Sequence, residues 1–273
     1  MGLKSLIDSF PAAGRAFRDL RDRRGEAALT LRSMHGFSLW GGNYLAAGFH
    51  EEAETEIVAE LLREADILVD VGANSGLFAC LSASRGIQCI ALEPMPANLR
   101  ILLRNIRHNG FEHLIEALPV AASDEIGVLP FFGRGQGASL VAGWGGAPDF
   151  DRLLVPTNTL DNLLADRLTG KRVVLKIDVE GAELRVLNGA RKLLGSRPPI
   201  LLEASLTRNH PDGFNPDFSR IFETLWSLGY SAYVADGERS LVSAENLATW
   251  CVGRQSDAGT ENFLFRVDEV SNP

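Results

Sequence analysis

The sequence predicts an α/β protein with a mostly parallel sheet that helices cover on both faces. Segments typical of buried strands and of amphipathic helices alternate from about residue 48 onward. Parallel strands need crossover connections, and the alternating helices supply them. A second observation is that acidic residues follow the ends of most of these strands, at the edge where open α/β sheets bind ligands. We find no internal repeat and no low-complexity segment.

Composition favours one large α/β domain with an extension. The chain has 273 residues, of which 45% are hydrophobic, enough for a sizeable core. A formal charge of −8 argues against binding to nucleic acids. No apolar run reaches the roughly 18 residues of a membrane span, and we expect no secretion signal. The three scattered cysteines fit a reducing, cytoplasmic location without disulfide bonds or metal ligands.

The first part of the chain is expected to be a helical arm. Apolar residues from Leu3 to Leu20 lie on or near one stripe of a helix over residues 1–33, with arginines and aspartates beside them. Such a helix can lie on an anionic membrane or pack against its own domain or a second subunit, and the aspartates favour packing. We therefore expect residues 1–47 to form a helical arm and a glycine-rich loop, through which a homodimer can form.

Residues 48–273 are expected to form one domain, with a helix near Glu51 ahead of the first strand and an insertion near residues 126–158. The strands are apolar runs bounded by turn residues. They are Ile67–Val71, Gln88–Leu92, about Ala117–Ala121, Val128–Phe132, Leu154–Thr157, Arg172–Ile177, Pro199–Leu202, Ser231–Val234 and Asn262–Val267. The last two look like a hairpin with an intervening excursion, so we expect one edge strand to be antiparallel.

The helices between these strands have apolar residues at helical spacing and clear end signals. Pro94 and Pro96 stop a strand ahead of a helix that Asn109-Gly110 closes, and Thr159 caps a shorter helix. The expected helices are Leu77–Ala83, Ala97–His108, Leu160–Leu164, Ala182–Leu194 and Asp217–Leu228.

Carboxylates stand at the expected ends of four of the five central strands. They are Asp70, Glu93, Asp178 and Glu203, while Ala122-Ser123 follows the remaining strand. Because ligands bind outside the carboxyl ends of the strands in such sheets, we expect these residues to surround one site.

The turn Asp70-Val-Gly72-Ala-Asn74-Ser-Gly76 joins a strand to a helix and brings backbone N–H groups close to a ligand. It lacks the G-x-G-x-x-G pattern of dinucleotide sites, and Asp70 would repel a pyrophosphate. Glu93 follows Asp70 by 23 residues, the usual distance for a carboxylate that accepts ribose hydroxyls. An adenosine ligand with an ammonium and a sulfonium, such as S-adenosylmethionine, fits these features.

Several separated motifs resemble, in the same order, the FkbM family of S-adenosylmethionine-dependent methyltransferases. They are Asp70–Gly76, Glu93-Pro-Met-Pro-Ala-Asn98, Val155-Pro-Thr-Asn-Thr-Leu-Asp161 and Lys176-Ile-Asp178-Val-Glu180-Gly181-Ala-Glu183, with Glu51 ahead of the first helix. The resemblance covers about residues 48–205. It implies a class I methyltransferase (Rossmann-like) fold with a mostly parallel seven-stranded sheet, and commonly O-methylation of sugars or other small molecules. Residues 1–45 and 206–273 match no motif of that family, and we expect them to choose the acceptor.

The resemblance also implies roles in cofactor binding. The Gly72–Gly76 turn would approach the methionine moiety, Glu93 would hold the ribose, and Ala122-Ser123 would border the adenine. Asn98 would touch the cofactor or cap a loop. The expected cofactor-binding residues are Asp70, Gly72, Ala73, Asn74, Gly76, Glu93, Asn98, Ala122, Ser123 and Asp178.

Methyl transfer to a hydroxyl needs an in-line approach and a group that accepts the proton. Our candidate catalytic residues are Asp178, then Glu203, then His210 in a loop rich in proline and glycine. Glu180 and Glu183 can face the same pocket or cap a helix, and capping is favoured for Glu183. The carboxylates can also hold a divalent cation, but we predict no metal site.

The sequence therefore predicts an S-adenosylmethionine-dependent O-methyltransferase whose acceptor is a sugar hydroxyl of a glycan or a natural product. Trp40, Tyr44 and Trp144 are candidates for stacking on a sugar ring. Three alternatives stay open. They are methylation of an amine or a carboxylate, a nicotinamide or nucleotide-sugar enzyme of similar topology, and a binder of S-adenosylmethionine without activity. The absence of G-x-G-x-x-G argues against the second.

Overall fold

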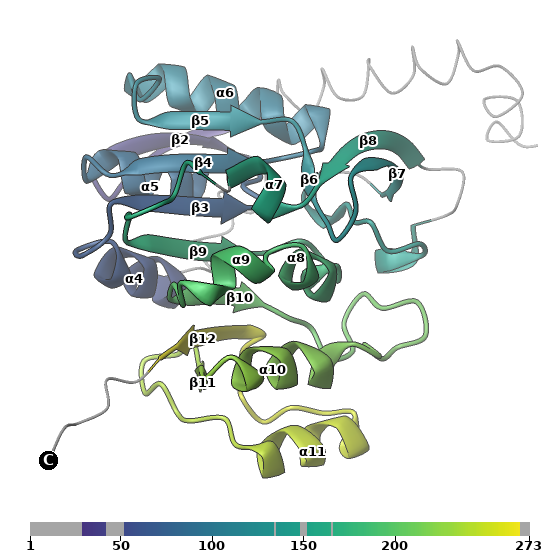
Figure 1. Ribbon diagram of the computed structural model, residues 1–273. Coiled ribbons are helices and arrows are strands. Elements are labelled where there is room, and N and C mark those ends of the chain that lie inside the picture. Colours follow the sequence, from purple (N-terminus) through teal and green to yellow (C-terminus); the bar gives the residue numbers. More distant parts are fainter. Residues whose placement is uncertain (1–28, 42–51, 134, 148–151, 165, 268–273) are drawn as a thin grey trace, which may run out of the picture.

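The computed structural model describes residues 29–41, 52–133, 135–147, 152–164 and 166–267, and a seven-stranded sheet forms its centre (Figure 1). In spatial order the strands are β11 (Ser231–Val234), β12 (Asn262–Arg266), β10 (Ile200–Glu203), β9 (Val173–Ile177), β3 (Ile67–Val71), β4 (Gln88–Leu92) and β5 (Ile115–Leu118). Neighbours from β10 to β5 pair in parallel. The predicted α/β class with a mostly parallel sheet is confirmed.

The antiparallel strand is β12, which pairs with β10 on one side and with β11 on the other. We expected the antiparallel strand at the edge of the sheet, and this position is wrong because β12 is the second strand from the edge. After β11 the chain leaves the sheet, forms a helix, and returns between β11 and β10, so the edge strand β11 runs in the common direction.

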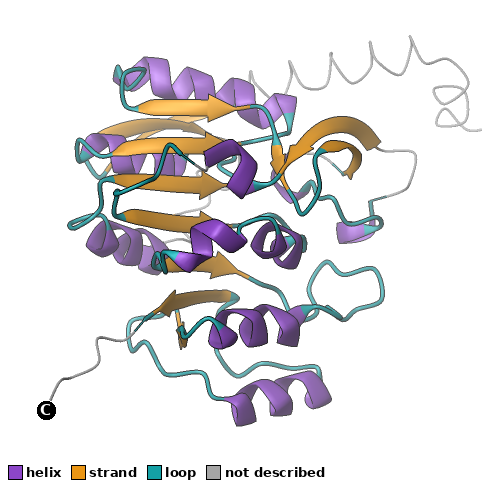
Figure 2. Cartoon of the chain, in the orientation of Figure 1, coloured by secondary structure: helices purple, strands orange, loops and turns teal. Residues whose placement is uncertain are grey.

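Helices cover both faces of the sheet (Figure 2). One layer holds α4 (Glu52–Leu61), α5 (Leu77–Ser84) and α6 (Pro96–Asn109). The other holds α7 (Leu160–Leu164), α8 (Glu183–Asn188), α9 (Arg191–Gly195), α10 (Phe218–Ser227) and α11 (Ala244–Gly253). Along β3, Leu68 belongs to the first core, and Val69 and Val71 belong to the second, as the period-2 alternation of a strand requires. Asp70 therefore points into the layer that holds α5.

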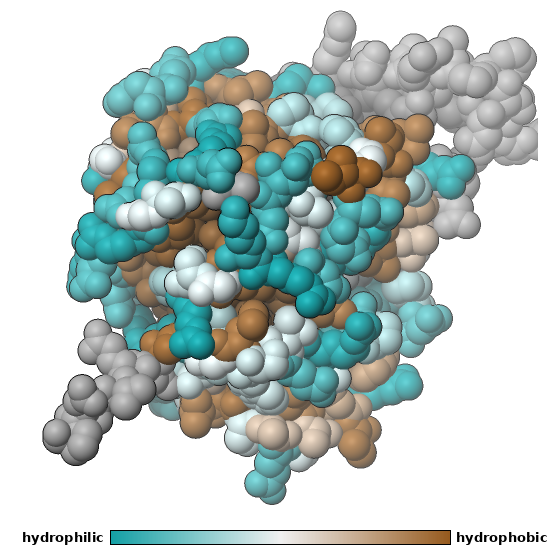
Figure 3. Space-filling view, viewed as in Figure 1, coloured by the Kyte–Doolittle hydropathy of each residue, from teal (hydrophilic) through white to brown (hydrophobic). Residues whose placement is uncertain are grey.

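A second, three-stranded sheet contains the expected insertion near residues 126–158. Its strands are β6 (Ala121–Ala122), β8 (Arg152–Asn158) and β7 (Gly127–Phe132), and the short 3-10 turns η1 (Gly135–Gly137) and η2 (Trp144–Gly146) follow β7. Its inner face packs Phe131 and Val155 against Met95. Ile126, Val128 and Leu154 are exposed, and Figure 3 shows apolar atoms where Figure 1 places this small sheet.

The hairpin of β1 (Thr30–Met34) and β2 (Phe37–Gly41) corrects the expectation of a helix as far as residue 33. His35 and Gly36 have φ of 47° and 87°, which is the two-residue turn geometry typical of tight hairpins. Asn105 and Asn109 of α6 then bond the free edge of β2 at Trp40 and Ser38. The rest of the expected arm and loop, residues 1–28 and 42–47, lies outside the described residues.

The structure differs from the sequence prediction in three smaller ways. The strand expected at 117–121 splits into β5 and β6 because Pro119 has no N–H to donate. The helix expected at Ala182–Leu194 splits at Gly189, where an added Cβ would lie 2.0 Å from the Ser123 carbonyl oxygen. Helix α11 is absent from the sequence prediction, although Ser243 begins it with a capping box.

Candidate active site

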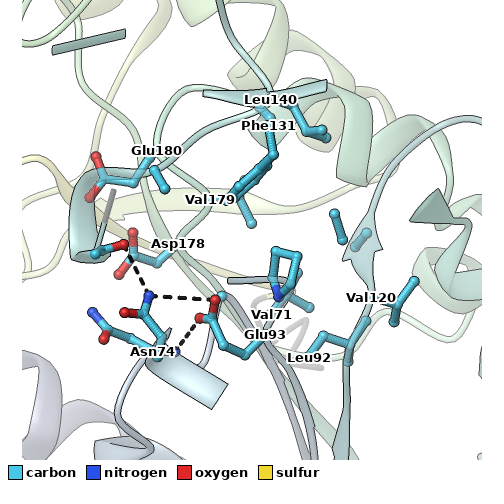
Figure 4. Close-up of a pocket in the computed structure, with 18 residues that line it drawn as sticks. Val71, Asn74, Leu92, Glu93, Val120, Phe131, Leu140, Asp178, Val179 and Glu180 are labelled. Atoms are coloured by element: carbon cyan, nitrogen blue, oxygen red, sulfur yellow. Dashed lines mark hydrogen bonds between the residues drawn. The ribbon is translucent and has the colours of Figure 1, made fainter. Parts of the chain in front are cut away.

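A pocket of about 580 Å³ opens at the carboxyl ends of β3, β4 and β9 (Figure 4). The large sheet contributes one part of its lining, and the small sheet with the turns that follow β7 contributes the other. Of the ten residues expected to bind a cofactor, six line this pocket: Gly72, Asn74, Glu93, Asn98, Ala122 and Asp178. The pocket lies at the edge where open α/β sheets bind ligands.

The turn after β3 has a geometry that depends on glycine at position 72. Gly72 has φ of 84°, and an added Cβ would lie 1.8 Å from the carbonyl oxygen of Asp178, which follows β9. Asn74 lines the pocket with φ of 51°, a left-handed conformation that asparagine tolerates better than most residues. The close approach of two strand ends therefore explains why the turn contains a glycine here.

Glu93 holds this turn against β4. One carboxylate oxygen accepts the N–H of Asn74 at 2.8 Å, and the other accepts the N–H of Met95 at 2.8 Å. The Asn98 amide donates to the second oxygen at 3.5 Å, near the limit of hydrogen bonding, and also donates to the Gly135 carbonyl at 3.0 Å. Burial raises the pKa of Glu93 to about 7, although these donors oppose the shift. A carboxylate has about four acceptor positions, so Glu93 keeps room for a ligand hydroxyl.

Apolar side chains from both sheets line the other side of the pocket. Leu92 and Val120 lie on the large-sheet side, and Phe131 and Leu140 come from the insertion (Figure 4). Of the residues on this side, Ala122 was expected from the sequence, whereas Phe131 and Leu140 were not. Their signal is weak because β7 alternates irregularly and Leu140 lies in an aperiodic, glycine-rich segment.

The acidic side of the pocket is organised by Lys176 on β9. Its ammonium donates to the Asp178 carboxylate at 2.7 Å, and lies 4.9 Å from the centre of the Phe78 ring. Lys176 is buried, while Asp178 lines the pocket. The ion pair therefore holds Asp178 at the pocket wall.

Glu180 lines the pocket beside Asp178 (Figure 4). The indole N–H of Trp144 donates to its carboxylate at 3.0 Å, and the Ser139 hydroxyl donates to its backbone carbonyl at 2.6 Å. Burial, and then the charge of Asp178, raise the pKa of Glu180 to about 7. From the sequence we expected Glu180 to face the pocket or cap a helix and did not choose it as a base. The position of Glu180 in the pocket makes it the strongest candidate base that we missed.

Two further carboxylates lie behind this wall. Glu203, a predicted catalytic residue, is bonded by Arg208 at 3.0 Å, and burial and the charge of Asp178 raise its pKa to about 9. Glu183 is buried and accepts the Gly181 N–H at 2.7 Å, and burial raises its pKa to about 8. Neither lines the pocket. This bond is to the turn ahead of α8 and not to an N–H of its first turn, so the capping role that we expected for Glu183 stays a prediction.

Asp70 lies beneath the pocket and does not line it. It is fully buried, and neither carboxylate oxygen has a hydrogen-bond partner among the described residues. Burial raises its pKa to about 6, while the charge of Lys176 lowers it. Lys176 lies opposite Asp70 in the β3–β9 pairing. Its positive charge therefore acts on Asp70 as well as on Asp178, with which it forms an ion pair.

Three other expected cofactor residues also lie outside the lining. Ala73 is buried in the turn, and Ser123 is buried with its hydroxyl donating to Asp124. Gly76 has φ of 90°, and an added Cβ would lie 2.4 Å from Leu102 Cδ1. Gly76 thus permits α5 to pack closely on α6.

His210 is buried against Trp144, with ring centres 4.6 Å apart in an edge-to-face arrangement, and does not line the pocket. Burial lowers the pKa of His210, which favours the neutral imidazole. Trp40 packs against Arg104 of α6, whose guanidinium carbon lies 3.7 Å from the centre of the Trp40 ring. Tyr44 lies outside the described residues.

The described residues lack two further features. They contain no group of three or more histidine, cysteine, aspartate or glutamate side chains placed to hold a metal ion. They also contain no helix with the length and apolar character needed to cross a membrane.

The chemistry of the pocket fits an adenosyl sulfonium ligand. Its described lining has an apolar side and a side with the three carboxylates of Glu93, Asp178 and Glu180, and it has no lysine or arginine. A dinucleotide phosphate would therefore meet acidic groups without a cation, whereas an ammonium or a sulfonium would meet opposite charge. A flat, apolar base suits the side that holds Leu92 and Val120.

Comparison with known proteins agrees with this fit. The family model described as "Methyltransferase FkbM domain" matches residues 70–232, more than half of the chain. A hexuronic acid methyltransferase, AglP, from Haloferax volcanii is 30% identical over 154 residues. That match covers 55% of this chain and 62% of the relative, so the chain spans less than two thirds of the relative's length.

Solved methyltransferase structures are also similar. A SAM-dependent methyltransferase from Agrobacterium tumefaciens has a TM-score of 0.49 at 10% identity, covering 89% of this chain and 71% of that one. A TehB-like methyltransferase from Corynebacterium glutamicum has a TM-score of 0.46 at 10% identity, with 83% and 93% covered. A precorrin-6Y C5,15-methyltransferase from Geobacter metallireducens has a TM-score of 0.40 at 16% identity, with 67% and 74% covered.

The family match over residues 70–232 confirms the resemblance seen in the sequence, and with it the cofactor, S-adenosylmethionine. The chain belongs to the FkbM family of S-adenosylmethionine-dependent methyltransferases.

Proposed function

We propose that this enzyme methylates a hydroxyl group, on a sugar of a glycan or natural product. The observation that carries the proposal is Glu180, a pocket-lining carboxylate whose pKa burial and Asp178 raise to about 7. A general base is most effective when its pKa lies near the working pH, and a sugar hydroxyl must lose its proton as it is methylated.

In this proposal different pocket residues bind different parts of the cofactor. Glu93 accepts a ribose hydroxyl, and the Gly72–Asn74 turn borders the methionine moiety. Leu92, Val120 and Ala122 border the adenine. Support comes from the position of Glu93 at the end of β4, between the turn and the apolar wall.

When bound, S-adenosylmethionine supplies an electrophilic methyl group on its sulfonium sulfur. Glu180 would accept the proton that the acceptor hydroxyl loses when it takes up this methyl group. Trp144 fixes the Glu180 carboxylate through its indole N–H. Asp178, held by Lys176, orients the acceptor hydroxyl by accepting a hydrogen bond. Glu203 and His210, which were candidate bases, are assigned supporting positions because neither lines the pocket.

The choice of a sugar hydroxyl rests on two points. The relative from Haloferax volcanii is named a hexuronic acid methyltransferase, although the match spans only part of both chains. The carboxylates of Asp178 and Glu180 would also repel a carboxylate acceptor at the point of transfer. The same acidic wall would attract an amine, so N-methylation is the second candidate function.

The test is release of S-adenosylhomocysteine from S-adenosylmethionine with a panel of sugars, amines and carboxylates. We expect release with hydroxyl-bearing sugars, and methyl ethers as products by mass spectrometry. Release only with amines would replace the proposal by N-methylation. Binding of S-adenosylmethionine without release for any acceptor would favour the inactive binder.

We also propose a cytoplasmic location and a homodimer. Cys80 and Cys89 are buried as free thiols and Cys251 is partly buried as one, which supports a reducing, cytoplasmic location. A homodimer through residues 1–47 is expected, and light scattering of the full chain against a variant that lacks residues 1–28 tests it.

A further inference from the structure

A second pocket, of about 660 Å³, lies at the same edge of the large sheet as the cofactor pocket. One wall follows β10 and includes Thr207, and the other wall comes from residues 254–261, between α11 and β12. We call it the Arg254 pocket. Glu203 at the end of β10 pairs with Asn262 at the start of β12, so both walls begin beside the acidic side of the proposed active site.

Arg208 connects the Arg254 pocket to that acidic side. Its guanidinium bonds Glu203 at 3.0 Å and also forms an ion pair with Glu261, which lines the Arg254 pocket. The N–H of Ala204 donates to the Glu261 carbonyl at 2.8 Å and ties the two walls together. Arg208 also lies close enough to Glu180 for its charge to lower the pKa of that carboxyl, so Arg208 connects the Arg254 pocket to the acidic side of the cofactor pocket.

The lining of the Arg254 pocket has the chemistry of a carbohydrate site. Thr207, Ser256 and Thr260 contribute hydroxyl groups and Gln255 contributes an amide, groups that both donate and accept hydrogen bonds. The buried ring of Phe218 belongs to the same lining. A few polar groups over an apolar floor are typical of sites that bind small polar ligands.

The charged residues of this lining are Arg254 and Glu261, and the Glu261 carboxylate is paired with Arg208. Arg254 follows α11 in a left-handed conformation, with φ of 50°, and its guanidinium lies 5.0 Å from the centre of the Phe214 ring. No ion pair joins it to a carboxylate among the described residues, and Arg254 is an exposed residue that lines the pocket. A planar guanidinium held over a ring is prepared for bidentate bonding to a carboxylate.

The wall that contains Arg254 lies outside the part of the chain that matches the family. That match ends at residue 232, whereas the wall is residues 254–261. From the sequence we expected residues 206–273, together with residues 1–45, to choose the acceptor. The pocket thus combines a position next to the proposed transfer site with one wall inside the family match, which includes Thr207, and one wall outside it, which includes Arg254.

We propose that the Arg254 pocket binds a negatively charged sugar unit, a uronate, that adjoins the sugar being methylated. Arg254 binds its carboxylate, and Thr207 and Thr260 bond its hydroxyls. This inference rests on the proposed sugar specificity, but its direct test is binding and does not need methyl transfer.

The experiment is a calorimetric and NMR titration of the full chain, saturated with S-adenosylhomocysteine, with D-glucuronate and with D-glucose as the neutral match. We expect D-glucuronate to bind at least tenfold more tightly than D-glucose. Arg254→Gln should remove this difference, and Arg254→Lys should keep part of it because the charge remains without the planar fork. Arg107→Gln, at an exposed arginine on α6, is the matched control and should change nothing.

Thr207→Val keeps the shape of the wall, and should weaken both sugars by about threefold to tenfold through loss of a hydrogen bond. Equal binding of the two sugars, no detectable binding of D-glucuronate, or full binding to Arg254→Gln overturns the proposal. If D-glucuronate binds through Arg254 but no sugar is methylated, the subsite stands and the proposed function fails. If neutral sugars are methylated and Arg254→Gln has no effect on sugar binding, the proposed function stands and the subsite fails.

Discussion

Lys176 and Asp178 lie two residues apart at the end of β9, and a 2.7 Å ion pair joins their side chains at the wall of the cofactor pocket. Among the described residues, Lys176 is the one lysine or arginine that is buried. The carboxylates that its charge affects are Glu54 from α4, Asp70 from β3, Glu180 after β9 and Glu203 from β10. One ammonium therefore compensates a whole group of acids, and its loss should affect both stability and catalysis.

We expect Lys176→Met to lower the free energy of unfolding by about 3 kcal/mol, because it leaves partly buried carboxylates without their cation. It should also shift the acidic limb of the pH–activity profile to higher pH, since the lysine lowers the pKa of Glu180. Denaturant titration and pH–rate measurements check both. Lys171→Met, at an exposed lysine, is the control. A destabilised variant with an unmoved acidic limb would reduce Lys176 to a purely structural residue.

Glu180→Gln tests the proposed base. We expect turnover to fall by about 10²- to 10⁴-fold, the usual contribution of general base catalysis, with affinity for S-adenosylhomocysteine nearly unchanged. In the unaltered enzyme the rate should rise with pH through about 7 as Glu180 loses its proton, and the variant should lack this rise. Glu56→Gln, exposed on α4, is the control. Wild-type turnover in Glu180→Gln would show that Glu180 is not the base. Asp178 would then be the next candidate, and Asp178→Asn tests it.

Gly72→Ala should be severely destabilising, by about 3 kcal/mol or more, because the added Cβ meets the Asp178 carbonyl oxygen at 1.8 Å. Gly86→Ala is a matched control, since Gly86 also has positive φ but no atom within 4 Å of an added Cβ. It should cost only the left-handed penalty of about 1–2 kcal/mol. Thermal or denaturant unfolding measures both, and similar losses would contradict the close approach of the two strand ends.

Glu183 makes stability depend on pH in a predictable direction. Burial raises its folded-state pKa to about 8, above the ordinary 4.5, so the folded protein keeps a proton that the unfolded chain releases in this range. Its contribution is present below pH 4.5 and is lost as pH rises towards 8. We expect Glu183→Gln to flatten this fall by about 1.4 kcal/mol per pH unit.

Denaturant titrations at several pH values, with the exposed Glu64→Gln as control, measure that slope. A variant whose stability falls with pH as steeply as the parent would show that Glu183 ionises normally in the fold.

Strand ends were the part of this protein that the sequence predicted best. Apolar runs that end in an acid identified β3, β4, β9 and β10, and parallel pairing then brought Glu93 and Asp178 to one pocket. Both steps depend on local periodicity and on a general rule of α/β sheets, so neither needs long-range detail.

Features that depend on side-chain direction or on distant contacts were not predictable in the same way. Asp70 looked like a pocket residue because it lies at a strand end, but the alternation of β3 turns it into the α5 layer. Phe131 and Trp144 enter the site from a glycine-rich insertion, whose path is set by contacts with Met95, Gly181 and His210. No spacing rule encodes such contacts.

The central claim is that the pocket between β3, β4 and β9 holds S-adenosylmethionine with Glu93 on its ribose. Calorimetric titration of S-adenosylhomocysteine into the parent and into Glu93→Ala tests it most directly, with the exposed Glu116→Ala as control and circular dichroism to verify folding. We expect a tenfold to hundredfold loss of affinity in Glu93→Ala, the cost of hydrogen bonds to a charged group, and none in the control. Equal affinities in a folded Glu93→Ala variant would contradict the account.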